Sequence, residues 1–202
     1  MRRLLDDKFF DLLDAGAEEA RNSVRLLRRF LETGGESAAA FAAVRQNCNR
    51  IYQEIRSKLV TTIMPSLRKE DIEALSRALL LISQAAERFV QRAGLAADRP
   101  ASLDFSRPVS LLEQAMATVV AMVNLLRGFE SLGRTGVLQV GLQEATDRAE
   151  TLVEELIGGL YRGADDPLRM VIAKDLCDRM LEIVDRCRAV GPIVSQIVLE
   201  YM

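Results

Sequence analysis

The chain has 202 residues, of which 49% are hydrophobic and 28% are charged, and its formal net charge is −2. This balance favours a folded protein, and the weak overall charge does not favour a nucleic-acid partner or an anionic membrane. Histidine is absent and the three cysteines follow no CxxC spacing, which excludes a Ser-His-Asp triad and the usual zinc sites that contain histidine. We therefore expect a protein without enzymatic activity, whose cysteines are reduced core residues.

Two features of the sequence bear on the location of the protein: its first residues and its longest uncharged stretch. Met1-Arg-Arg-Leu-Leu runs straight into charged residues at 6–8, which is not the pattern of a secretory signal. The longest uncharged stretch, Gln114 to Leu126, is shorter than the roughly 20 residues that a membrane helix needs. We expect a cytoplasmic protein with no membrane insertion.

Apolar residues at three- and four-residue spacing predict three helices in the first half of the chain, over about 6–32, 37–63 and 69–92. Gly34-Gly35 and Pro65 are expected to end the first two. Acidic residues open the third, where they favour the helix dipole: Glu70, Asp71 and Glu73.

Three more helices are predicted in the second half. The fourth opens near Pro108 and is expected to break at Gly133 and Gly136, so that the fifth covers about 137–160. The turn at 163–167 has the chemistry of a helix start, and the sixth helix is expected to run from about 168 to the C-terminus with a kink at Pro192.

No strand-like alternation competes with these helices, so the predicted fold class is all-α. Two sets of three helices around one linker predict an internal repeat. We expect a first three-helix bundle over 1–95, a linker over 96–108 and a second three-helix bundle over 109–202. The two are expected to be related by a pseudo-twofold axis and to pack together as one domain.

Four short motifs, taken in order, carry a resemblance to a known family: Phe9-Phe10-Asp11-Leu12-Leu13, Thr61 to Ile72, Asp165-Asp166-Pro167-Leu168 and Glu182 to Cys187. The chain resembles the PhoU-like proteins whose genes often accompany low-affinity Pit phosphate transporters, and the resemblance extends over essentially its whole length. It implies a PhoU-like fold. It also implies a regulatory or accessory role, carried out by docking helical surfaces to a partner such as the cytoplasmic face of a Pit-type transporter.

The resemblance also implies acidic clusters that hold hard cations, and here the sequence departs from the family. Of the family's acidic pattern, only Glu87 remains in the first half, because other residue types stand in the remaining acidic positions: Arg45, Gln46, Asn47, Asn49, Leu80, Leu81 and Gln84. Neither leucine nor a neutral amide offsets the charge of a dehydrated divalent ion. We expect no metal in this half.

The second half keeps more of the acidic pattern, although Gln143 and Arg188 also stand in acidic positions. The residual metal candidates are Asp147, Glu182 and Asp185. A guanidinium at position 188 is expected to pair with Asp185 or Glu182 and to take the place of a cation. We therefore expect no cofactor and no multinuclear metal cluster, and at most one weakly bound ion.

Two predicted helix faces are acidic. One contains Asp147, Glu150 and Glu154 of the fifth helix, and the other contains Asp178, Glu182 and Asp185 of the sixth. They form either a residual cation site or, as we favour, solvated faces paired with Arg148, Arg179 and Arg186. An arginine cluster at 21, 25, 28 and 29 is either a docking site for an acidic partner or phosphate or, as we favour, a solvated face.

The leading hypothesis is the regulatory protein that the resemblance implies. The alternatives are a carboxylate metal-binding protein with one residual site, and a helical scaffold that oligomerises. We also predict a homo-oligomer, most simply a dimer, because the apolar last turn Ile197-Val198-Leu199 is expected to be exposed.

Overall fold

The computed structural model describes residues 2–33, 38–95, 103–128, 132–162 and 166–201. These residues contain helices and no strand. The helices are α1 (Arg2–Thr33), α2 (Ala38–Thr61), α3 (Lys69–Leu95), α4 (Ser106–Leu125), α5 (Leu132–Arg162), α6 (Pro167–Arg188) and α7 (Val190–Glu200). The all-α prediction is confirmed.

The start of α6 follows from its sequence. The side chain of Asp166 caps the helix by accepting a hydrogen bond from the Leu168 amide at 3.4 Å, and Pro167 occupies the first turn. A proline costs nothing there, because the first amides of a helix have no partner within the helix. The helix-start chemistry predicted for Asp166 and Pro167 is confirmed, while residues 163–165 lie outside the described ranges.

Several helix boundaries differ from the sequence prediction, and α4 already begins at Ser106, within the predicted linker 96–108. The predicted kink at Pro192 is present, but it divides the sixth helix into α6 and α7 at Ala189. Proline has no amide to bond the carbonyl four residues earlier, at Arg188, so the disturbance lies one turn before the ring. The predicted break at Gly133 and Gly136 is wrong, because both glycines lie within the first turns of α5.

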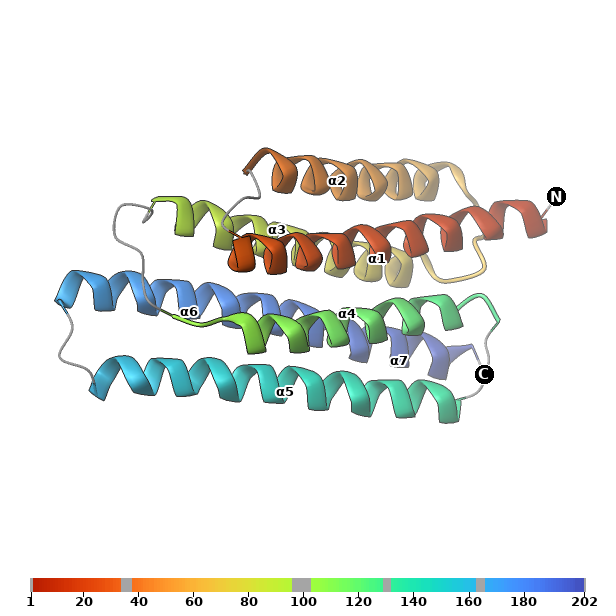
Figure 1. The fold of residues 1–202 in the computed structure, drawn as a ribbon. Coiled ribbons are helices and arrows are strands. Elements are labelled where there is room, and N and C mark those ends of the chain that lie inside the picture. The colour runs from red at the N-terminus through yellow and green to blue at the C-terminus, as the bar shows by residue number, and fades with distance from the viewer. Residues whose placement is uncertain (1, 34–37, 96–102, 129–131, 163–165, 202) are drawn as a thin grey trace.

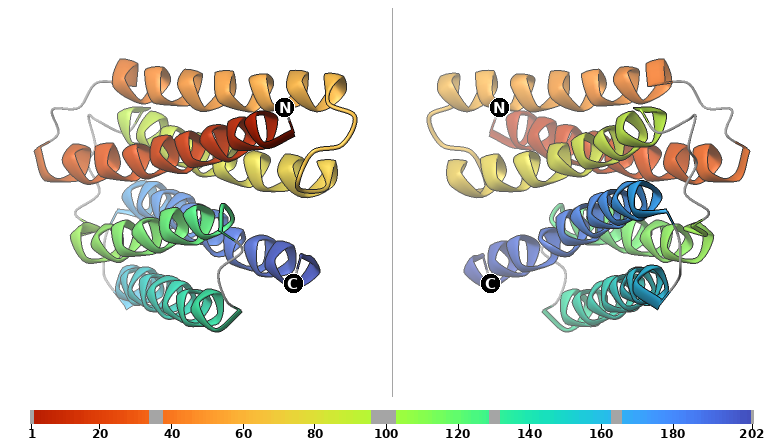
Figure 2. Two further views of the ribbon diagram at one scale, coloured as in Figure 1. Left: turned by 90° about the vertical axis from the view of Figure 1, so that its right-hand side faces the viewer. Right: turned by 90° about the vertical axis from the view of Figure 1, so that its left-hand side faces the viewer.

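The helices form two stacked bundles, as Figure 1 shows. The first contains α1, α2 and α3, and the second contains α4, α5, α6 and α7. The bundles meet where α1 packs on α4 and α3 packs on α6, whereas α2 and α5 lie on the two outer sides (Figures 1 and 2). The second bundle thus repeats the arrangement of the first, as the internal repeat predicts.

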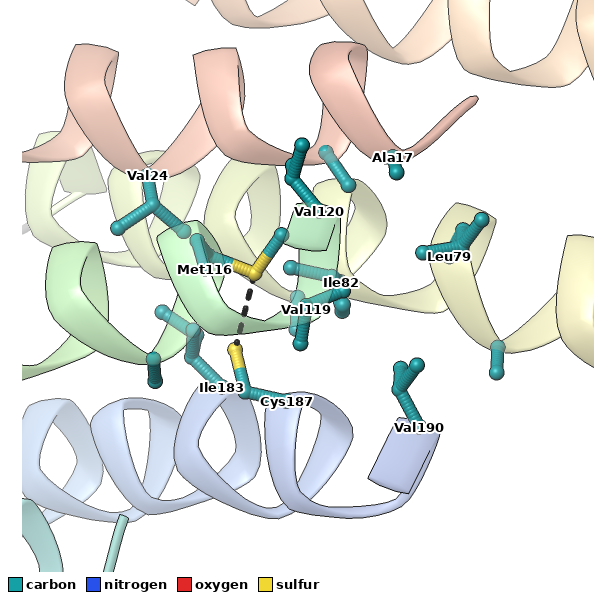
Figure 3. Close-up of a cluster of buried hydrophobic side chains, with 14 of the residues drawn as sticks. Ala17, Val24, Leu79, Ile82, Met116, Val119, Val120, Ile183, Cys187 and Val190 are labelled. Atoms are coloured by element: carbon teal, nitrogen blue, oxygen red, sulfur yellow. Dashed lines mark hydrogen bonds between the residues drawn. The ribbon is translucent and has the colours of Figure 1, made fainter. Parts of the chain in front are cut away.

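The core runs through the contact between the bundles without interruption. Figure 3 shows Val24 of α1 and Ile82 of α3 facing Met116 of α4 and Cys187 of α6. The Met116 and Cys187 sulfur atoms are 3.6 Å apart, and neither side chain is exposed. Burial of these residues supplies most of the attraction between bundles, at roughly 25 cal/mol per Å² of apolar surface removed from water. Met116, Met122 and Met180 are all buried in this core.

Arginine–carboxylate pairs border this apolar contact on both sides. Between α1 and α4, the Arg28 Nη1 atom lies 2.5 Å from Glu113. Between α3 and α6, Arg88 Nη1 lies 2.7 Å from Glu182, and a second pair joins Arg92 to Asp175 at 2.8 Å. These pairs fix the register of the two bundles more than they add stability, because exposed ion pairs contribute little.

One helix, α4 (Ser106–Leu125), is long and apolar enough to cross a membrane by length and composition alone. However, 61% of that stretch is buried inside the fold. The side chains that make it apolar, such as Leu112, Met116 and Val119, pack in the core. The hydropathy of α4 is therefore explained by its place between the two bundles.

Candidate functional site

The acidic cluster of the second bundle surrounds the guanidinium of Arg188. Its Nη1 atom lies 3.0 Å from Asp185, and its Nη2 atom lies 3.2 Å from Asp147 and also bonds Glu150. Its Nε atom donates to the buried Thr146 hydroxyl at 3.4 Å. The guanidinium therefore joins α6 to α5 at the place where the resemblance implies a cation. The predicted pairing of Arg188 with Asp185 is confirmed.

The third residual candidate, Glu182, is not part of this cluster. Its carboxylate accepts from Arg88 of α3 at 2.7 Å and from Arg179 at 3.2 Å, and Arg186 lies 3.7 Å away. Asp147 and Asp185 are thus brought together around one arginine, while Glu182 is held by three others. The solvated-face interpretation holds for Arg179 and Arg186, but it is wrong for Arg148, because Asp147 pairs with Arg188 instead.

The corresponding place in the first bundle also contains an arginine. Arg45 of α2 lies 2.5 Å from Glu87, which alone remains of the implied acidic pattern in that half, and the Glu87 side chain is only 10% exposed. Leu80 is buried, and the amide oxygen of Gln84 accepts from Arg88 at 3.4 Å. A nearly buried carboxylate needs a hydrogen-bonded positive partner, and Arg45 supplies it.

These donor sets do not fit the divalent cations that the fold family implies. A hard divalent ion needs about six oxygen donors and several negative charges. Each place offers instead a guanidinium already bonded to the available carboxylates. Among the residues that the structure describes, no group of three or more acidic or thiol side chains is arranged to hold a metal ion. The chemistry available here is ion pairing between helices.

None of the three cysteine thiols lies in an environment that favours the reactive thiolate. Burial raises the pKa of Cys48 and of Cys177 to about 11, and that of Cys187 to about 12. A thiol acts as nucleophile or metal ligand in its ionised form, which these pKa values disfavour near neutrality. All three are free and buried, as the sequence predicts.

The arginine cluster on α1 is largely balanced by its own acids. Arg21 pairs with Glu18 at 2.7 Å, and Arg28 bonds both Glu32 at 2.7 Å and Glu113 of α4. These two carboxylates raise the pKa of Arg28 above its ordinary value. The favoured interpretation, a solvated charged face, agrees with these pairs.

An apolar surface that the helical patterns did not reveal lies at the turn between α2 and α3. Val60, Ile63 and Met64 are exposed, Ile63 to 90%, while Leu59 and Leu67 beside them are buried. The C-terminus holds this turn, because the Arg68 amide donates to the Tyr201 hydroxyl and the Arg68 side chain pairs with Glu200. The signal available in the sequence was Pro65, which places the neighbouring apolar residues outside a helix.

Comparison with known proteins identifies the fold. No protein-family model matches the chain, and no curated protein matches it in sequence. Two solved structures from Shewanella oneidensis MR-1 are similar to it. One, a PhoU-like protein, superposes with a TM-score of 0.79 over 95% of this chain and 99% of its own, at 16% identity.

The second structure is described as that of a PhoU-like phosphate regulatory protein, and it superposes with a TM-score of 0.75 over the same shares at 16% identity. The chain has the PhoU-like fold. The predicted fold class is therefore confirmed, over nearly the full length of the chain.

Proposed function

We propose that this chain is a non-enzymatic regulator of phosphate transport that works without bound metal and acts by docking to a transporter in the cytoplasm. The observation that carries the proposal is the match to PhoU-like structures over 95% of the chain, one of them described as a phosphate regulatory protein. Similarity over the whole length means that both bundles are present, so no part of that architecture has to be supplied by another chain.

The buried thiols and the absence of histidine support a role without catalysis. Such a protein works through the surfaces it presents to partners. The α2–α3 turn is one such surface, since Val60, Ile63 and Met64 expose apolar area at a turn that the C-terminus holds in place. Exposed apolar residues gathered on an ordered turn are typical of contact sites. The partner we propose is the cytoplasmic face of a Pit-type phosphate transporter.

Arg188 and Arg45 support the metal-independent part of the proposal. Each guanidinium places a fixed positive charge among the carboxylates that remain between two helices. Arginine stays ionised throughout the physiological pH range, so these contacts need no ion from solution. This arrangement also disfavours the alternative of a carboxylate metal-binding protein.

The expectation that the last turn Ile197-Val198-Leu199 is exposed, on which the homo-oligomer prediction was based, is wrong for two of its three residues. Ile197 and Val198 are buried in the core of the chain itself, and only Leu199 of that turn is exposed. A homo-oligomer stays a proposal, which sedimentation at several concentrations tests. A single monomeric species throughout would refute it.

Uptake of labelled phosphate in cells tests the proposed function. Deleting the gene is expected to change the uptake rate, and the wild-type chain is expected to restore it. The variant Ile63→Glu places a charge on the α2–α3 turn and is expected not to restore it. The control Val171→Glu, at an exposed apolar residue of α6, is expected to restore it. An uptake rate that does not respond to deletion would contradict the proposal.

A further inference from the structure

A groove of about 360 Å³ lies between α4 and α5, away from the ion pairs described above. Arg107 and Gln114 of α4 and Arg148 of α5 line it, together with the apolar side chains of Leu111 and Leu152. The volume is at the lower end of the range of small-molecule sites, roughly 300–1,000 Å³. The groove thus combines two guanidinium groups with an apolar floor.

The Arg148 guanidinium has no carboxylate partner within the described ranges, although α5 is rich in acids. Asp147 and Glu150, its neighbours in sequence, bond Arg188 of α6 on another face of the helix. Residues one or two positions apart on a helix point in different directions, so these acids do not face Arg148. Arg188 binds two of the five acids of α5, Asp147 and Glu150. Glu144 lies one turn before Arg148, but in the part of the chain that the structure describes it forms no ion pair with Arg148, so the charge of Arg148 is unpaired in the groove.

Arg107 is similarly free to bind an anion. Asp104 is close enough to interact with its charge, and the Asp104 carboxylate accepts the Ser106 amide at 2.9 Å just before α4, whose N-cap residue Phe105 makes no side-chain cap hydrogen bond. No ion pair of Arg107 is present in the part of the chain that the structure describes. Ser110 and Gln114 also line the groove and add a hydroxyl and an amide as donors.

We infer that this groove binds a small organic oxyanion with a short apolar chain, such as an alkyl phosphate or a carboxylate. Guanidinium groups bind both kinds of oxyanion through paired hydrogen bonds, and Leu111 and Leu152 accommodate the apolar part. The hollow beside Arg25, Arg28 and Arg29 on α1 is a weaker site, since Arg28 is already bonded to two glutamates. The inference does not depend on the proposed function.

Calorimetric titration of the full chain with butyl phosphate tests the site. Wild type is expected to bind, and Arg148→Gln is expected to weaken binding about tenfold or more, the effect of losing a charge-assisted hydrogen bond. The control Arg169→Gln removes an exposed arginine of α6 and is expected to bind as wild type does. Circular dichroism verifies that both variants keep their helices. Equal affinity of Arg148→Gln and wild type, or no binding by wild type, would overturn the inference.

Three further ligands separate the contribution of the charged group to binding from that of the apolar chain. Hexanoate binding as tightly as butyl phosphate supports a site for oxyanions in general, and weaker hexanoate binding supports one that favours phosphates. Inorganic phosphate is expected to bind more weakly than butyl phosphate, and Leu152→Ser is expected to remove that difference. If inorganic phosphate binds wild type as tightly as butyl phosphate does, or if butanol alone binds as tightly, the inference is wrong.

Discussion

Replacing Arg188 by glutamine is expected to destabilise the protein and to create a response to divalent cations. The change removes the guanidinium that bonds Asp147, Glu150 and Asp185, and it leaves the three carboxylates facing one another. Their side chains are 53%, 39% and 67% exposed, so solvent screens each pair. At about 0.2–1 kcal/mol for an exposed pair, three independent pairs would contribute about 0.6–3 kcal/mol. Pairs that share one guanidinium are not fully additive, so we expect a loss of about 1–2 kcal/mol.

For a chain of this size, such a loss lowers Tm by about 2–8 °C. Differential scanning fluorimetry measures it, with Arg169→Gln as a control of equal charge change at an exposed position of α6. Adding Mn²⁺ is expected to raise the Tm of Arg188→Gln, because the three carboxylates, which are not arranged around an ion in the wild-type structure, can move toward one once the guanidinium is removed. Wild type is expected not to respond. A Tm of Arg188→Gln equal to that of wild type, or equal stabilisation of both proteins by Mn²⁺, would refute the reasoning.

Three smaller predictions concern the core and the C-terminus. Phe89→Ala, which removes a buried ring packed edge-on against Phe105 at 5.4 Å, is expected to cost about 3–5 kcal/mol in chemical denaturation, and a loss below about 1 kcal/mol would contradict this. Burial raises the pKa of the Cys187 thiol from 9.0 to about 12, because the fold favours the neutral thiol over the thiolate. The free energy of unfolding that depends on this neutral thiol is therefore fully present below pH 9 and is lost as the pH rises toward 12. Wild type is therefore expected to lose more stability than Cys187→Ala between pH 9 and 11. Tyr201→Phe removes the hydroxyl that accepts the Arg68 amide and is expected to cost about 1 kcal/mol, with faster hydrogen exchange at Arg68; unchanged exchange would count against that bond.

Most of the fold was predictable because long helices leave a periodic apolar stripe. The three-four spacing located the helices, although α6 and α7 were predicted as one kinked helix, and Pro167 and Pro192 marked a start and a kink correctly. Gly133 and Gly136 misled the prediction, since glycine lowers helix propensity by only about 1 kcal/mol and tertiary packing overrides that. Thr135, between them, is buried in the fold, and its hydroxyl has no hydrogen-bond partner among the described residues, so this part of α5 is helical because it packs and not because of a side-chain bond.

In the candidate site, ion pairs within one helix were predictable from the sequence, whereas ion pairs between helices far apart in the sequence were not. Arg188 in an acidic position, three residues after Asp185, indicated an ion pair within α6. The contact between Arg88 and Glu182 joins residues 94 positions apart, and no local pattern reveals it. The unpaired charge of Arg148 was unpredictable for the same reason. Whether its side chain lines the groove depends on which face of α5 packs on α4, and no local pattern shows that.

Metal analysis of the purified protein tests the central claim most directly, which is that arginines have replaced cations in this PhoU-like fold. The protein is purified without chelator, dialysed against Mn²⁺, Fe²⁺ and Zn²⁺ in turn, desalted and measured by inductively coupled plasma mass spectrometry. The account predicts less than one ion per chain for each metal, and more Mn²⁺ retained by Arg188→Gln than by wild type. Two or more tightly held ions per wild-type chain would contradict it.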